Sequence, residues 1–152
     1  MLTLSREPWD AADGRALRAE LLATYRERIG TRPPPEVAAD PEPADLLAWL
    51  VARDGHGAAL GCGALCAPGE LRRMYVRPAA RGRGVGRALL VALEDEARGA
   101  GLAELTLHTT EALVEARGLY AAAGYAIVRE GGDGERVDQW MVKRLSAERG
   151  AP

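Results

Sequence analysis

The chain has 152 residues and a formal net charge of −2, with 20 Lys and Arg against 22 Asp and Glu. This slightly acidic balance argues against nucleic acid or an anionic membrane as a partner, and no apolar run is long enough for a transmembrane helix. The length suits one domain with its own core, and no signal pattern opens the chain. We expect a single domain over residues 1–152, soluble and cytoplasmic, with no nucleic acid and no membrane as partner.

The first part of the chain predicts a strand, a long helix and an irregular segment. Leu17, Leu21 and Tyr25 recur every four residues, which indicates the buried side of a helix. Asp10 or Asp13 is expected to cap the start of this helix, because a carboxylate there accepts hydrogen bonds from free backbone N–H groups. The expected bounds are 2–6 for the strand, up to about 28 for the helix, and 30–43 for a proline-rich segment with one short helical turn near 36–39.

Three strands are predicted next, joined by turns that contain Asp-Gly and Pro-Gly. Because the connections are short, consecutive strands are expected to pair in antiparallel fashion. The expected bounds are 46–53, 58–67 and 70–76.

Two cysteines, Cys62 and Cys66, fall on the second of these strands, four residues apart. A strand rises about 3.3 Å per residue, so their separation of roughly 13 Å is too large for a disulfide. His56 and His108 give no zinc-ligand spacing with them. We expect two small buried cysteines and no metal site.

The last part predicts a helix, a strand, a second helix and two final strands. Val85, Leu89 and Leu93 share one face of the first helix, and Glu94 is expected on its solvent face. A strand–helix–strand unit of this length implies a right-handed crossover between parallel strands. The expected bounds are 84–98 and 111–122 for the helices, and 102–108, 125–130 and 136–145 for the strands.

The stretch from Glu70 to Gly86 combines a strand with a turn of arginine and glycine that opens a helix. Such a turn leaves backbone N–H groups unpaired at the positive end of the helix dipole, a geometry that binds phosphate. Glycines let a ligand approach the backbone, and arginines add charge-assisted hydrogen bonds. The residues concerned are Arg81, Gly82, Arg83, Gly84, Gly86 and Arg87.

Two common phosphate motifs are excluded. G-x-G-x-x-G fits Gly82 and Gly84 but requires glycine where Arg87 stands, and a P-loop requires Gly-Lys-Ser/Thr, which the chain lacks. Residues 81–86 instead match the R/Q-x-x-G-x-G/A pattern of the GNAT family of N-acetyltransferases, whose loop holds the pyrophosphate of acetyl-CoA. Residues 116–125, reading ARGLYAAAGY, resemble a second signature of that family, A-x-x-L-Y-x-x-x-G-F/Y.

The resemblance implies a single-domain α/β fold of the GNAT type. Its mixed sheet is mostly antiparallel, with a central, splayed pair of parallel strands flanked by helices. It also implies an acetyltransferase that moves an acetyl group from acetyl-CoA to a primary amine by direct attack in a ternary complex, without a metal. The residues expected to bind coenzyme A are Met74, Tyr75, Val76, Arg81, Gly82, Arg83, Gly84, Val85, Gly86 and Arg87.

Two residues are candidates for proton transfer. Tyr120 matches the family tyrosine beside the coenzyme A sulfur, where its phenol can donate a proton or a hydrogen bond; it otherwise packs on the sheet. Glu70, expected at the mouth of the splayed strands, is the candidate base through water; it otherwise pairs with Arg72 or faces solvent.

A non-catalytic module that binds acyl-CoA as a sensor is the alternative to an enzyme. The resemblance fails where the family sets its acceptor, around residues 30–43 and the hairpin near 131–134. The amine acceptor therefore stays open, as do the acyl chain length and the choice between monomer and homodimer.

Overall fold

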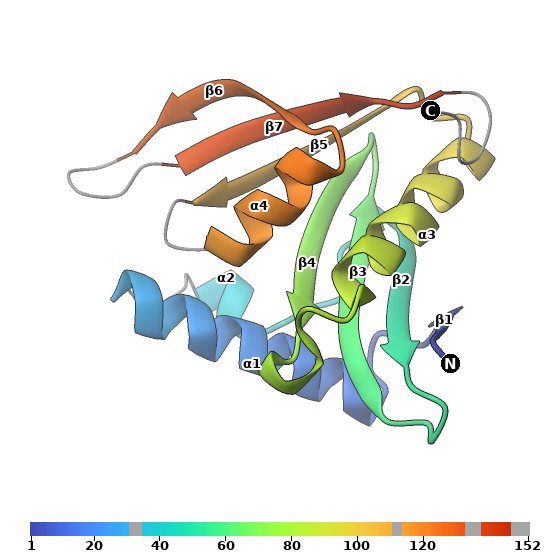
Figure 1. The fold of residues 1–152 in the computed structure, drawn as a ribbon. Helices are drawn as coiled ribbons and strands as arrows, with labels where there is room; N and C mark the ends of the chain where they lie inside the picture. The colour runs from blue at the N-terminus through green and yellow to red at the C-terminus, as the bar shows by residue number, and fades with distance from the viewer. Residues whose placement is uncertain (31–34, 111–113, 133–137, 147–152) are drawn as a thin grey trace.

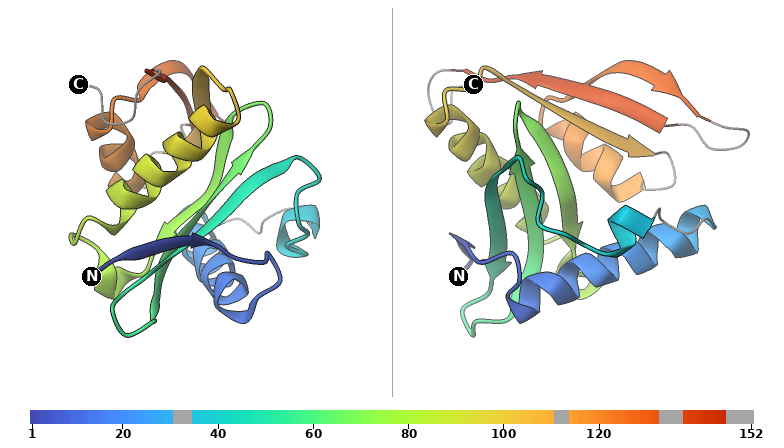
Figure 2. Two further views of the ribbon diagram at one scale, coloured as in Figure 1. Left: turned by 90° about the vertical axis from the view of Figure 1, so that its right-hand side faces the viewer. Right: turned by 180° about the vertical axis from the view of Figure 1, so that it is seen from behind.

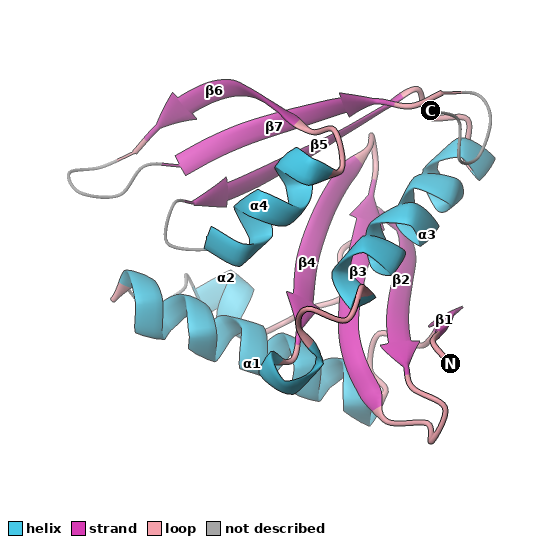
Figure 3. Cartoon of the chain, in the orientation of Figure 1, coloured by secondary structure: helices cyan, strands magenta, loops and turns pink. Residues whose placement is uncertain are grey.

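The protein, seen in a computed structural model, is described over residues 1–30, 35–110, 114–132 and 138–146. Figures 1 and 3 show the order of its elements. These are β1 (Thr3–Arg6), α1 (Ala12–Ile29), α2 (Pro35–Ala38), β2 (Leu46–Arg53), β3 (Ala59–Cys66), β4 (Glu70–Val76), a 3-10 turn (Pro78–Ala80), α3 (Val85–Gly99), β5 (Glu104–Thr110), α4 (Val114–Ala122), β6 (Ala126–Gly131) and β7 (Asp138–Arg144).

The described strands form one mixed sheet in the order β1-β2-β3-β4-β5-β7-β6. Neighbours are antiparallel except β4 and β5, which pair in parallel only at Glu70 and Thr106. The N–H of Thr106 donates to the carbonyl of Gly69 at 2.8 Å, next to this point. Figure 1 shows the arrowheads of β4 and β5 pointing apart from there. The mixed sheet with a splayed parallel pair is therefore confirmed.

Helices cover both faces of the sheet, as the view from behind in Figure 2 shows, with α1 and α2 on one face and α3 on the other. Leu89 and Leu93 of α3 are fully buried in the larger core cluster. Trp9, Leu17 and Trp49 belong to the smaller cluster on the α1 side. Both faces of the central strands are thus covered by apolar side chains, which explains why β3 is buried along its whole length.

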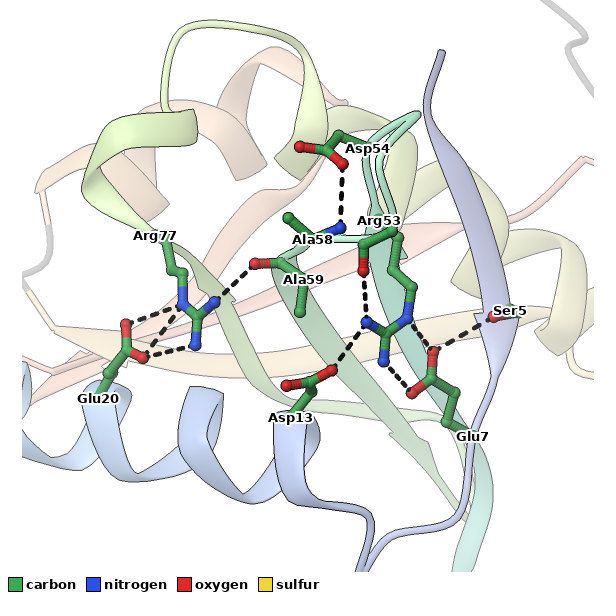
Figure 4. A network of polar contacts seen from close by, with 10 residues as sticks. Ser5, Glu7, Asp13, Glu20, Arg53, Asp54, Ala58, Ala59 and Arg77 are labelled. Carbon is green, nitrogen blue, oxygen red and sulfur yellow. Dashed lines mark hydrogen bonds and ion pairs between the residues drawn. The ribbon is translucent and has the colours of Figure 1, made fainter.

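Ion pairs fix α1 to the sheet (Figure 4). The Arg53 guanidinium donates to Glu7 at 2.8 and 2.9 Å and to Asp13 at 2.8 Å. The Arg77 guanidinium donates to Glu20 at 2.9 Å. Asp13 is therefore not the helix cap expected from the sequence, and neither is Asp10: the N-cap is Ala11, which has no side-chain hydrogen bond. Arg53 attracts the carboxylate more strongly than the backbone amides do.

Two further expectations, one for α3 and one for the residues that follow it, are wrong. Glu94 is 5% exposed rather than on a solvent face, because Tyr125 donates to it at 2.9 Å and Lys143 of β7 at 3.0 Å. Leu102 precedes β5 rather than opening it, since its N–H donates to the carbonyl of Ala97 and closes the end of α3.

Other expectations hold or fall outside the described residues. Cys62 and Cys66 are both buried and free. Residues 31–34, 111–113 and 133–137, which include parts of the predicted irregular segment, second helix and last hairpin, lie outside the described residues. Among the helices that are described, none is both long and apolar enough to cross a membrane.

Candidate active site

A pocket of about 390 Å³ opens where β4 and β5 diverge. Its volume lies within the usual range for small-molecule sites. Four structural elements that were predicted from the sequence contribute: one side of α1, the end of β4, the start of α3 and one side of α4. The lining residues are Leu21, Thr24, Arg28, Met74, Tyr75, Val76, Ala80, Arg81, Gly82, Gly84, Val85, Gly86, Arg87, Glu115, Ala116, Leu119 and Tyr120.

Unpaired backbone N–H groups form one wall of this pocket. Gly82 and Gly84 have φ of 75° and 80°, which glycine adopts without steric cost, and they curl the turn before α3. Gly84 is the N-cap of α3 and gives no side-chain cap, and the first turn holds no acidic residue. Within the described chain, the amides of residues 82–87 have no backbone acceptor. This wall, which we call the amide cradle, has the geometry of an anion site at a helix N-terminus.

Gly86 lines the pocket and also borders α4. A Cβ on this residue would lie 2.9 Å from Cδ2 of Leu119, so the missing side chain lets α3 and α4 approach each other. The sequence predicts close approach of a ligand at this glycine, and it gives no sign of this second neighbour.

Positive charge dominates the polar part of the lining. In the part of the lining that the structure describes, Arg28, Arg81 and Arg87 face a single acid, Glu115, so three guanidinium groups against one carboxylate give a net charge of +2. Arg83 is exposed and outside the lining. A polyanionic ligand therefore suits this pocket better than a neutral one.

Other arginines of the basic stretch bind acids of the protein itself. Arg77 pairs with Glu20, and Arg72 pairs with Glu70 and, at 3.3 Å, with Asp45. Only part of the charge that the sequence concentrates here is therefore offered to a ligand.

One ion pair bridges the pocket from α1 to α4. Arg28 donates from Nη1 and Nη2 to the two oxygens of Glu115, at 2.6 and 2.9 Å. Nη1 of Arg81 lies 3.8 Å from the same carboxylate. Hydrogen bonding to Arg28, more than any other cause, lowers the pKa of Glu115 to about 2. The sequence gives no signal for this pair, because the two residues lie 87 positions apart.

The exposed edge of β4 forms the apolar side of the pocket. Met74, Tyr75 and Val76 line it, and among the described strands β4 has no partner on the β5 side beyond Glu70. Its peptide groups there are available to an extended ligand, as in the addition of a strand. Just before Met74 the strand carries a bulge, at which Arg73 has φ of 58° and Sγ of Cys62 donates to its carbonyl at 3.3 Å.

Tyr120 reaches the same pocket from α4. It is 6% exposed, and its ring meets the ring of Tyr125 edge-on at 5.9 Å. Burial raises the pKa of its phenol, so the group stays neutral and remains a hydrogen-bond donor.

Glu70 lies at the closed end of the splay, where β4 and β5 pair, and not at the open mouth as expected. Its side chain is 40% exposed and bonded to Arg72, and it is outside the pocket lining. The pairing with Arg72 that the sequence left open is therefore present in the structure.

Comparison with known proteins agrees with this geometry. A model of the acetyltransferase (GNAT) family matches residues 14–125. An IAA acetyltransferase of Azospirillum brasilense is 42% identical over 95 residues, which are 59% of this chain and 56% of that protein. The chain spans about half or less of the length of the curated relatives it matches.

Solved structures resemble the whole chain. A protein of Klebsiella pneumoniae, provisionally described as an acyl-CoA N-acyltransferase, is 30% identical with a TM-score of 0.74, over 96% of this chain and 99% of that one. An acetyltransferase-like protein of Salmonella typhimurium, solved with acetyl-CoA, shares the fold at a TM-score of 0.65 and 20% identity, over 100% of this chain and 98% of that one.

Proposed function

Because the chain belongs to the acetyltransferase (GNAT) family, we propose that it moves an acetyl group from acetyl-CoA to a primary amine by direct attack in a ternary complex. The observation that carries the proposal is one continuous pocket with an amide cradle at one end, an open strand edge along its side and Tyr120 in its wall. Coenzyme A has the matching parts: phosphates, an extended amide-bearing arm and a thiol.

The cofactor residues follow from these parts. The amides of residues 82–87 would receive the pyrophosphate, with Arg81 and Arg87 adding charge. The backbones of Met74 and Val76 would hydrogen-bond the amides of the extended arm, as a neighbouring strand would. Bound in this way, acetyl-CoA supplies an activated thioester close to Tyr120.

The amine must be neutral to attack. A lysine-like amine has a pKa near 10.4, so at pH 7 about one molecule in 2,500 is neutral, a cost of roughly 4.6 kcal/mol. Glu70 is the proposed base. Since it lies outside the pocket lining and is bonded to Arg72, it takes the proton through water rather than by direct contact.

Tyr120 acts on the leaving sulfur. Its pKa is raised by burial, above that of a thiol near 8.5, so complete loss of its proton is unfavourable. We assign it a hydrogen bond to the sulfur as negative charge develops there. The proton that ends on the thiol comes from the amine nitrogen, which loses it as the amide forms.

The test is release of free thiol with a panel of amines. Tyr120→Phe and Glu70→Gln are compared with Tyr25→Phe and Glu104→Gln, matched changes outside the pocket lining. We expect each of the first two to lower kcat by about 100-fold with little change in KM for acetyl-CoA, and Glu70→Gln to move the pH profile. Turnover that neither variant slows would overturn both roles, and binding of acetyl-CoA without turnover on any amine would support the sensor instead.

A further inference from the structure

Arg73 is a charged side chain that the proposed chemistry does not use. It lies at the bulge of β4 with φ of 58°, a conformation that residues other than glycine rarely adopt. Its side chain is partly buried, and it makes no hydrogen bond or ion pair with any residue that the structure describes. Burial, more than any other cause, lowers the pKa of its guanidinium, which is the sign of a positive charge without sufficient compensation.

The carboxylate of Asp40, which lies near Arg73, is bound to another arginine. Nε of Arg18, which is 1% exposed, donates to both oxygens of Asp40, at 2.8 and 2.9 Å. Asp40 raises the pKa of Arg73 but does not bond to it. Among the described residues, no acceptor is therefore bonded to the guanidinium of Arg73, although an acid lies nearby.

A surplus of negative charge lies along the same strand. Arg72 is shared by Asp45, at 3.3 Å, and Glu70, so two carboxylates face one guanidinium and leave a net charge of −1. These acids are 41% and 40% exposed and accessible to a ligand. The strand thus offers an uncompensated cation and an uncompensated anion, separated by Arg72.

We propose that Arg73 binds a carboxylate of the acceptor, so that the acceptor is an amine that also carries an acid group. The inference rests on the proposed acetyl transfer and names its substrate class. Met74, the next residue along β4, lines the pocket, whereas Arg73 itself lies outside that lining. The acceptor would therefore extend past Met74 to reach the guanidinium of Arg73. Glu70 and Asp45 attract the ammonium end of such a molecule, and its acid end meets the planar guanidinium fork.

The test compares amines with and without an acid. Glycine, β-alanine and 4-aminobutyrate are each paired with the corresponding amide, with 2-aminoethylphosphonate as a second oxyanion and acetate as an acid without an amine. Binding to the protein saturated with coenzyme A is measured by calorimetry, and thiol release is measured in parallel. We expect at least one acid to bind about tenfold or more tightly than its amide, and acetate to bind more weakly than that acid.

Substitutions at position 73 test whether Arg73 causes the preference for an acid over its amide. Arg73→Asn removes the charge with a residue that tolerates positive φ, Arg73→Lys keeps the charge without the fork, and Arg15→Asn removes an exposed arginine of α1 as a control. Arg73→Asn should weaken binding of the acid by about 10- to 100-fold and leave binding of the amide unchanged. Arg73→Lys should keep part of the preference for the acid, and Arg15→Asn should keep all of it.

Two results would overturn the proposal: no acid of the panel binding better than its amide, or a preference that survives Arg73→Asn in protein with the normal melting temperature. Failure of the proposed acetyl transfer gives a different result: no amine causes thiol release, but binding of each acid can still be compared with binding of its amide.

Discussion

Glu115→Gln is predicted to tighten the binding of acetyl-CoA while it weakens the fold. Glu115 is the single acid in the described pocket lining and holds Arg28 by two hydrogen bonds. Its removal raises the net charge of the lining from +2 to +3 and frees a guanidinium for the phosphates. In water, the interaction energy between a unit charge and each phosphate charge, at a separation of roughly 8 Å, is about 0.5 kcal/mol. Two such charges give about 1 kcal/mol without screening and about 0.4 kcal/mol in physiological salt.

The expected change, measured by calorimetry, is therefore a Kd about fivefold lower at low salt and about twofold lower at physiological salt. Glu104→Gln, which removes an exposed acid outside the lining, is the control. The loss of stability should not exceed about 1 kcal/mol, because Glu115 is 51% exposed. Weaker binding of acetyl-CoA by Glu115→Gln would refute this account of the pocket charge.

The pH dependence follows from the same ion pair. The pKa of Glu115 is lowered from 4.5 to about 2 by Arg28, so its contribution to stability is complete above pH 4.5. It is lost as the pH falls toward 2. The difference in stability between wild type and Glu115→Gln should be constant from pH 6 to 8 and decrease below about pH 4.5. A difference that grows on acidification would contradict the pairing.

Three further predictions concern packing and burial. Gly86→Ala should change the free energy of unfolding by less than about 1 kcal/mol, since the gain in helix propensity offsets the displacement of Leu119. The same substitution should raise the Kd for acetyl-CoA, because Leu119 is pushed into the pocket. Lys143→Met should cost about 3 kcal/mol in chemical denaturation by leaving Glu94 buried without its cation, and a smaller loss would mean that Glu94 is solvated. Cys62, whose pKa burial raises to about 12, should resist iodoacetamide at pH 8 until the protein unfolds.

The sequence predicts the central strands well because the turns between them are marked by glycine and proline. The bounds of β2 and β4 agree with the structure, and β4 leads into the amide cradle at the predicted place. These features are local: a strand, a glycine turn and an amphipathic helix can each be recognised within a few residues.

The missed features depend on residues far apart in the chain. The periodicity of α3 assigns Glu94 to a polar face, yet Glu94 is buried and Lys143 from β7 donates a hydrogen bond to it. Arg28 of α1 meets Glu115 of α4 only in the folded chain, where the two helices lie on opposite sides of the pocket. No glycine or proline stands next to Arg73 that would indicate the bulge from the sequence. Such partners are set by tertiary packing, so inspection of one segment does not reveal them.

The most direct test of the central claim is a titration of 15N-labelled protein with acetyl-CoA, followed by the backbone amide resonances. The amides of residues 82–87 should shift most, together with those of Met74 and Val76, and saturate with one Kd. Saturable binding that leaves residues 82–87 unperturbed, or no binding at all, would contradict the account.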